Sequence, residues 1–123
     1  IIKENLNSLA RDLRLLRENN DFFGKDLEKN IYLKNKNYLT NLNIINFASN
    51  AQYKLKDFSE IMRRILQSKL HTFPLNGKYF IKNGMNEGLA LGKVLKMIEA
   101  EWINNNFKIS KDRVKEIIQL NSN

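Results

Sequence analysis

Few residues of this chain have the type and spacing that catalysis requires. Asp26 and Glu28, and likewise Glu99 and Glu101, are carboxylates separated by one residue, a spacing that can hold Mg²⁺ when it occurs on a strand. On a helix, however, residues i and i+2 point roughly 200° apart and cannot converge on one ion. His71, the one histidine, has no identifiable catalytic partner. We therefore expect no catalytic residue in this chain.

Metal and cofactor sites are not indicated either. The chain has no cysteine, which excludes disulfides and thiolate ligands, and a single histidine argues against a zinc site. No glycine-rich phosphate loop of the P-loop or dinucleotide type is present. We expect no metal and no cofactor in the chain itself.

The elements that carry the remaining polar residues all read as helices. Apolar residues recur at spacings of three and four, first in Ile2, Leu6, Leu9, Leu13 and Leu16. The pattern predicts helices over 2–19, 26–37, 39–48, 57–70, 78–83 and 88–104, and a last one after Ser110. We predict an all-α fold: a compact multi-helix bundle that ends in a glycine-punctuated helical hairpin and a short C-terminal helix.

The stretch 73–107 is the most distinctive part of the sequence, because it holds four of the five glycines and the only proline. A glycine in a helix costs about 0.5–1 kcal/mol relative to alanine, so some structural or functional need must offset it. We predict that Asn76 caps the first helix of the hairpin, which buries Phe80 and Ile81, and that Gly84 ends it. Asn86 is the candidate N-cap of the second helix.

The second helix of the hairpin has a clear apolar face. Its members are Leu91, Val94, Leu95, Ile98 and Trp102. Gly92 falls on or beside this face, and a residue without a Cβ there would let the two helices approach closely.

The glycine and apolar residues of this stretch form a pattern with characteristic spacing. Its members are Leu75, Gly77, Phe80, Ile81, Gly84, Met85, Gly88, Leu91, Gly92, Leu95, Trp102, Ile103 and Phe107. The pattern resembles the C-terminal region of bacterial tRNA nucleotidyltransferases, which belong to the class II CCA-adding and poly(A) polymerase family. A weaker match extends upstream over most of the chain. Asp12 to Arg17 is similar to the nucleotide-reading helix of the same family, but that helix lies much further ahead of the glycine motif there, so we do not assign it.

The resemblance implies a function and a division of labour. The chain would be the body and tail that hold the tRNA acceptor and T-arm region by shape and backbone charge. A catalytic head, in cis or in trans, would add nucleotides to the 3′ end with CTP, ATP and Mg²⁺. The parent protein would then be an enzyme of the cytoplasm, while this chain alone would not be one.

The glycine turn is the best candidate for the tRNA contact. A helix N-terminus presents unpaired N–H groups and about half a positive charge, which makes it an anion site. We therefore expect the turn from Gly84 to Gly88 to contact tRNA phosphates, assisted by Lys82, Lys93 and Lys96. Glu87 argues against this, because a carboxylate would occupy or repel the site. The alternative is that the glycines serve only turn geometry and helix packing.

Positive charge is concentrated in the middle of the chain. The net charge is +8, and residues 37–83 hold seven basic and two acidic side chains, or +5 of that total. Such a distribution is typical of a surface that meets phosphate. We predict an RNA-binding surface formed by Arg63, Arg64, Lys69, Lys78, Lys82, Gly84, Gly88, Lys93 and Lys96. The alternative is a solvated face in a lysine-rich protein.

Two other functions stay open. The chain could be a helical adaptor that packs against a protein, or forms a homo-oligomer, through an exposed Leu6–Leu16 face. It could also be a DNA-binding helix-hairpin-helix module, which the spacing of Gly84 and Gly88 resembles.

The organisation of the chain can also be predicted. We expect one helical domain, with body-like helices in 1–72 and a tail-like hairpin and last helix in 73–123. Because the chain begins at Ile1 inside a helical pattern, we expect a piece of a longer protein. No apolar run is long enough to span a membrane.

Overall fold

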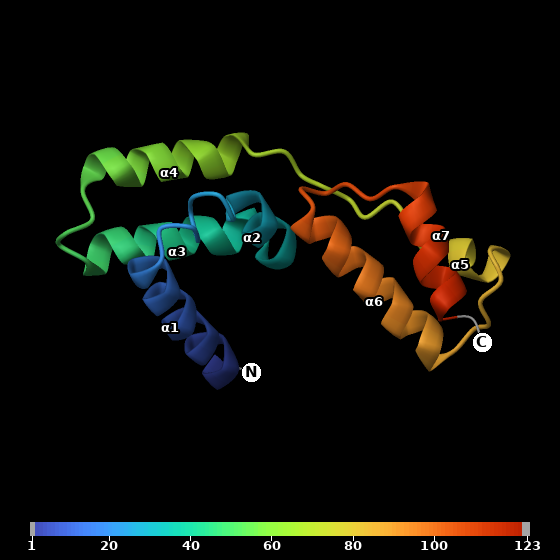
Figure 1. Ribbon diagram of the computed structural model, residues 1–123. Helices are drawn as coiled ribbons and strands as arrows, with labels where there is room; N and C mark the ends of the chain where they lie inside the picture. The colour runs from blue at the N-terminus through green and yellow to red at the C-terminus, as the bar shows by residue number, and fades with distance from the viewer. Residues whose placement is uncertain (1, 122–123) are drawn as a thin grey trace. The chain divides into compact units, whose positions relative to one another are not determined.

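The structure is a computed structural model that describes the backbone of residues 2–121 and the side chains of residues 6–121. These residues form seven helices and no strand, which confirms the predicted all-α class (Figure 1). The helices are α1 (Ile2–Glu18), α2 (Leu27–Lys34), α3 (Lys36–Ser49), α4 (Leu55–Gln67), α5 (Gly77–Lys82), α6 (Leu89–Asn104) and α7 (Lys111–Leu120). They divide into two compact units: unit 1 is Ile1–Leu70 and unit 2 is His71–Asn123.

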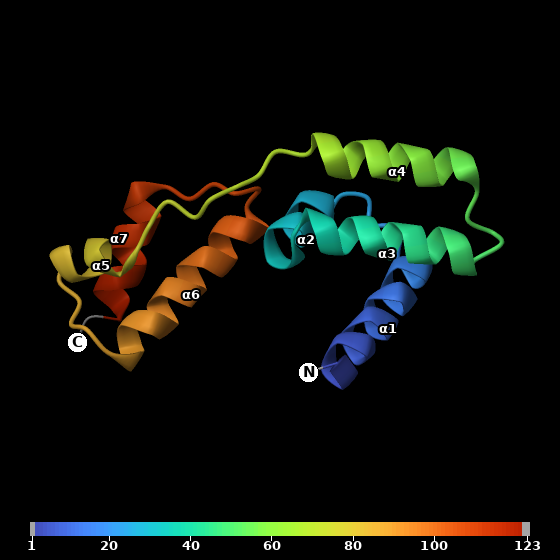
Figure 2. The ribbon, with the colours of Figure 1, turned by 180° about the vertical axis from the view of Figure 1, so that it is seen from behind.

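Unit 1 is built around α3, which contacts α1, α2 and α4. α4 runs alongside α3 in both views (Figures 1 and 2). The buried core is Phe22, Phe23, Leu27, Ile31, Leu39, Leu42 and Ile65. Leu9, Leu13 and Leu16 of α1 pack against this core, whereas Leu6 is exposed. Most of the apolar face that the adaptor alternative requires is therefore covered; Ile2 lies outside the described side chains.

The junction between α2 and α3 is a break within the predicted helix 26–37. Asn35 has a φ of 84°, so it ends α2, and its side chain then accepts a hydrogen bond from the backbone N–H of Tyr38 and caps α3. A positive φ is accessible to Asn, which also is a favoured N-cap residue. One residue thus ends one helix and starts the next.

A buried carboxylate ties three helices of unit 1 together. Asp12 of α1 is 1% exposed. Its Oδ2 accepts a hydrogen bond from the Tyr38 hydroxyl of α3 at 2.6 Å and lies 3.2 Å from Nζ of Lys34 of α2. The paired and hydrogen-bonded state offsets the cost of burying the charge. Asp12 is thus an internal structural group of this unit.

We expect two tyrosines of unit 1 to ionise late in an alkaline titration. Burial and the hydrogen bond to Asp12 raise the pKa of Tyr38 to about 12, and burial and the nearby Asp57 carboxylate raise the pKa of Tyr53 to about 12. The folded state therefore keeps these protons longer than the unfolded state, whose tyrosines titrate near about 10. Stability from both groups is full below pH 10 and falls as the pH rises towards 12.

Absorbance at 295 nm, recorded against pH, measures this directly. Tyr38→Phe should remove a step near pH 12 and leave the earlier steps in place. A titration of the whole chain that is complete well below pH 11 would contradict the burial of both hydroxyls.

Unit 2 has a separate core around α6, which contacts α5 and α7. The buried residues are Phe80, Met85, Leu91, Val94, Ile98, Val114, Ile117 and Ile118. At the other end of α6, Trp102 is buried and packs against Phe73 and Phe107, with ring centroids 5.2 and 5.0 Å away. His71 stacks on Phe107 at 3.8 Å. The apolar face predicted for the second helix of the hairpin is confirmed.

Local capping signals explain the ends of α5 and the start of α7. The side chain of Asn76 accepts a hydrogen bond from the N–H of Tyr79, as predicted. At the other end Gly84 has a φ of 105°, and the N–H of Met85 donates to the carbonyl of Phe80 at 3.0 Å. This is a Schellman C-cap with its usual apolar contact, since the side chains of Phe80 and Met85 lie in the same core. Ser110 caps α7 as predicted.

Four local predictions for these helices are wrong. The N-cap of α6 is Gly88 and not Asn86, because Gly88 takes a φ of 142° that only glycine adopts readily. Gly92 does not mediate a close contact, since a Cβ there would have no atom within 4 Å. Ile81 is 46% exposed. α4 starts at Leu55, which places Asp57 in its first turn and not at its N-cap.

Candidate functional site

The turn between α5 and α6 is open to solvent. All its residues from Asn83 to Gly88 are exposed except Met85, which anchors the turn to the core. A Cβ built on Gly84 or Gly88 would have no atom within 4 Å. Both glycines are required by their positive φ, and neither is covered by a side chain. A ligand can therefore reach the backbone of this turn directly.

The start of α6 has no internal compensation for its unpaired N–H groups. α3, α5 and α7 are each capped by a side chain, and α2 and α4 carry an acidic residue in the first turn. α6 has neither, so among the starts of α2 to α7 it is the one without a side-chain cap or a first-turn carboxylate. Glu87, which the sequence places at this end, gives it no side-chain cap. The positive end of the helix dipole is thus left open.

Two lysines follow on the outward face of α6. Lys93 and Lys96 are exposed and lie opposite the buried face of the helix. Leu89, which is 86% exposed, lies on the same outward side. On α5, Lys78 and Lys82 are one helical turn apart and also exposed. Within residues 6–121, none of these four lysines forms an ion pair or a hydrogen bond through its side chain, so their charges are available to a ligand.

Two carboxylates of unit 2, those of Glu101 and Glu116, are paired with Arg113 of α7 and not with the lysines of α5 and α6. Arg113 donates from Nε to Oε2 of Glu101 at 2.8 Å and from Nη1 to Oε1 of Glu116 at 2.8 Å. Hydrogen bonding to Arg113 holds the pKa of Glu101 below its usual value. This arginine is therefore occupied by acidic groups of its own unit, while the lysines named above are not.

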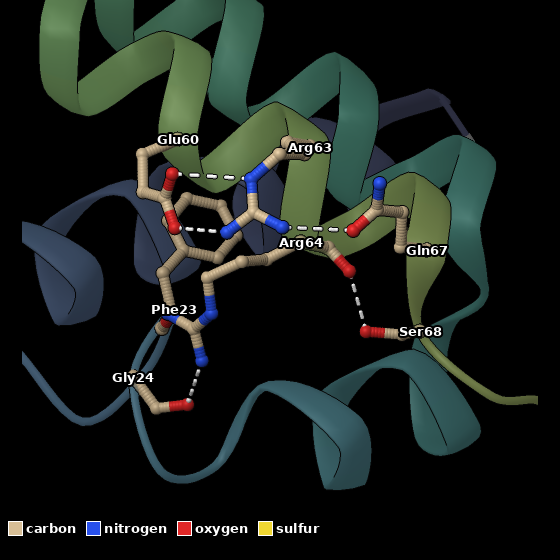
Figure 3. A network of polar contacts seen from close by, with 7 residues as sticks. All are labelled: Phe23, Gly24, Glu60, Arg63, Arg64, Gln67 and Ser68. Atoms are coloured by element: carbon tan, nitrogen blue, oxygen red, sulfur yellow. Dashed lines mark hydrogen bonds and ion pairs between the residues drawn. The ribbon is translucent and has the colours of Figure 1, made fainter.

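The adjacent arginines of α4, which lie in unit 1, are also occupied (Figure 3). Arg63 forms an ion pair with Glu60 and donates from Nη1 to Gln67 at 2.8 Å. Arg64 turns the other way: Nη1 donates to the carbonyl of Phe23 at 2.7 Å and Nη2 to the carbonyl of Gly24 at 3.0 Å. Arg64 thus holds the loop that follows α1 against α4.

The nine residues predicted to bind RNA therefore fall into two groups. Arg63, Arg64 and Lys69 belong to unit 1, where both arginines are engaged and Lys69 is exposed. The other six belong to unit 2 and are all exposed: Lys78, Lys82, Gly84, Gly88, Lys93 and Lys96. The structure thus places the glycine turn and the lysines of α5 and α6 in one unit, apart from the residues of α4 and Lys69.

Sequence reasoning missed a polar hollow in unit 1, lined by Arg17 and Asn46 among others. The signal for it was Asn46 itself, a polar residue in the predicted helix 39–48 that is buried in the structure. A buried polar side chain needs partners, so its presence in a helix indicates either a structural network or a ligand.

Comparisons of the chain with protein-family models, with curated proteins and with solved structures found no match. The described residues contain no group of three or more His, Cys, Asp or Glu side chains that could hold a metal ion. Within residues 2–121, none of the helices has the length and apolar character that crossing a bilayer needs.

Proposed function

We propose that unit 2 binds RNA through its phosphate groups. The observation that carries the proposal is the start of α6, which is exposed and has neither a side-chain cap nor an acidic residue in its first turn. Glu87 precedes the N-cap Gly88 without capping the helix, and two unpaired lysines follow on α6. Backbone N–H groups and lysine ammonium groups are the usual partners of phosphate oxygens. Contacts of this kind fix the position of an RNA without reading its bases, so recognition would depend on shape and charge.

We further propose that this RNA is tRNA and that the chain is the tRNA-holding tail of a nucleotidyltransferase of the CCA-adding type. The resemblance of stretch 73–107 to that family supports this. In the structure the apolar residues of the pattern belong to unit 2, and Phe80, Met85 and Leu91 share its core. Nucleotide addition, with CTP, ATP and Mg²⁺, would be the work of a separate head in the cytoplasm.

Removing the two lysines of α6 tests the proposal. We expect Lys93→Gln/Lys96→Gln to weaken binding of a tRNA transcript about tenfold near 0.1 M salt, because two phosphate contacts are lost. The slope of log K against log salt should fall by roughly 1.4–1.8, at about 0.7–0.9 for each contact. Filter binding or fluorescence anisotropy over a salt series measures both quantities.

A matched control has the same charge change on another helix of the same unit. Lys111→Gln/Lys115→Gln removes two exposed lysines of α7. If this variant weakens binding as much as the α6 variant, the attraction is a general effect of net charge and the proposed surface is wrong. Preference for duplex DNA over tRNA would favour the helix-hairpin-helix function, and self-association without RNA affinity would favour the adaptor.

A further inference from the structure

Unit 1 contains a polar hollow of about 370 Å³, which we call the unit 1 pocket. It is formed by the end of α1, the loop that follows it, the end of α3 and the start of α4. Its polar walls include Arg17, Asn19, Asn46, Asn50, Asp57 and Arg64, and apolar contact comes from residues such as Phe23 and Ile61. This volume lies within the range of small-ligand sites, which is about 300–1,000 Å³.

The most informative residue of the unit 1 pocket is Asn46, whose side chain is buried with only 3% of the residue exposed. Its Oδ1 accepts a hydrogen bond from Nε of Arg17 at 2.9 Å. Its Nδ2 donates to no group among the described residues. Every side-chain nitrogen or oxygen that is buried in the described part of the chain has a hydrogen-bond partner, so Nδ2 must keep some accessible surface. Because Asn46 lines the hollow, this unpartnered donor is available to a ligand there.

Two guanidinium groups line the same pocket, and hydrogen bonds within the fold hold both in place. Arg17 donates to Asn46 and, from Nη2, to Oγ of Ser49 at 2.7 Å. Arg64 is held by two backbone carbonyls (Figure 3). Nη1 of Arg17 and Nε of Arg64 have no partner within the described residues. Donors fixed in this way need little reorganisation when a ligand binds.

The charge of the lining decides the class of ligand. The walls carry two guanidinium groups and one carboxylate, that of Asp57, so an anion is favoured. Asn46, Arg17 and Arg64 come from α3, α1 and α4, so their donors approach from different sides. Charge-assisted hydrogen bonds from arginine to phosphate oxygens are among the strong ones. We propose that the unit 1 pocket binds a phosphate group, which belongs either to a small phosphorylated molecule or to the backbone of a bound RNA.

A single isosteric substitution tests this. Asn46→Asp keeps an oxygen to accept from Arg17 and replaces the unpartnered NH₂ with a carboxylate oxygen. In the full chain we expect inorganic phosphate, at constant ionic strength, to shift the NMR signals of the Asn46 side-chain amide and of Arg17 Nε–H saturably. Asn46→Asp should lower phosphate affinity at least tenfold. Asn41→Asp, the same change at an exposed position of α3, should leave it within twofold.

Measuring tRNA binding in the same variants separates this proposal from the proposal that unit 2 binds RNA. If Asn46→Asp also weakens tRNA binding more than Asn41→Asp does, the phosphate is supplied by RNA; if only phosphate binding falls, the ligand is a small molecule. Arg17→Lys keeps the charge without the fork and should also lose phosphate affinity, which covers the case that Asn46→Asp unfolds. No saturable shift with phosphate, or Asn46→Asp and Arg17→Lys both binding phosphate like the unchanged chain, would overturn the proposal.

Discussion

Phe80→Ala is expected to unfold unit 2 and to leave unit 1 folded. Phe80 has no exposed surface, and its ring packs in the same core as Met85, whose backbone N–H caps α5 by donating to the Phe80 carbonyl. Truncation of a buried phenylalanine costs about 3–5 kcal/mol. That is comparable with the whole stability expected for a unit of this size, at roughly 0.05–0.15 kcal/mol per residue. Unit 1 should survive because the two buried cores share no residue.

The chain has a single tryptophan, Trp102, and it is buried in unit 2, so its fluorescence in urea reports the unfolding of that unit. Backbone amide NMR signals from α1 to α4 report unit 1. Ile81→Ala is the matched control, because Ile81 is on the same short helix and about half exposed, and its loss should cost less than 1 kcal/mol or so. Collapse of the unit 1 signals in Phe80→Ala would show that the two units fold as one.

Alanine should have opposite effects at two glycines, Gly88 at the N-cap of α6 and Gly92 inside the helix. Gly88 has φ 142° and ψ −166°, a region that is essentially restricted to glycine, so Gly88→Ala should destabilise unit 2 by about 1–3 kcal/mol. Gly92 lies inside the helix with nothing within 4 Å of the position of a Cβ. Gly92→Ala should therefore stabilise unit 2 by about 0.5–1 kcal/mol, through helix propensity and lower entropy of the unfolded chain.

Urea midpoints from Trp102 fluorescence compare the two variants directly. The two substitutions add the same methyl group, so they are controls for each other, and the sign of the difference is the decisive result. A loss of stability in Gly92→Ala would mean that another segment approaches this face of α6. An unchanged midpoint in Gly88→Ala would mean that the turn relaxes to a conformation that alanine accepts.

The helices could be predicted where the signal was local. Asn76, Gly84 and Ser110 act through hydrogen bonds within a few residues of themselves, so their roles follow from the sequence. The N-cap of α6 did not follow, because it depends on the conformation of Gly88, whose positive φ places it at the cap in place of Asn86. The start of α4 at Leu55 did not follow either, because its N-cap residue, Lys54, forms no side-chain cap and so leaves no signal in the local sequence.

The candidate site was predicted only in part. Counting charges located a basic region but treated Arg63 and Arg64 as equivalent to the lysines, and only side-chain geometry separates the engaged cations from the available ones. The sequence shows where Gly92 lies on the helix, which suggested a close helix contact, but it does not show that no neighbouring segment lies within 4 Å of a Cβ there. The role of Asn46 cannot be predicted from the local sequence, since the residues that line the pocket with it come largely from α1 and α4 and are distant in sequence.

The way in which Arg64 holds the loop after α1 also limits which residues can replace it during evolution. Its planar fork reaches the carbonyls of Phe23 and Gly24 together, and the single ammonium of a lysine could not reproduce that geometry. In a chain this rich in lysine, exchange of arginine for lysine would be an easy mutational step at Arg14, which is exposed. At Arg64 the same exchange would free the loop, so selection for a folded protein should retain arginine there whatever ligand the protein binds.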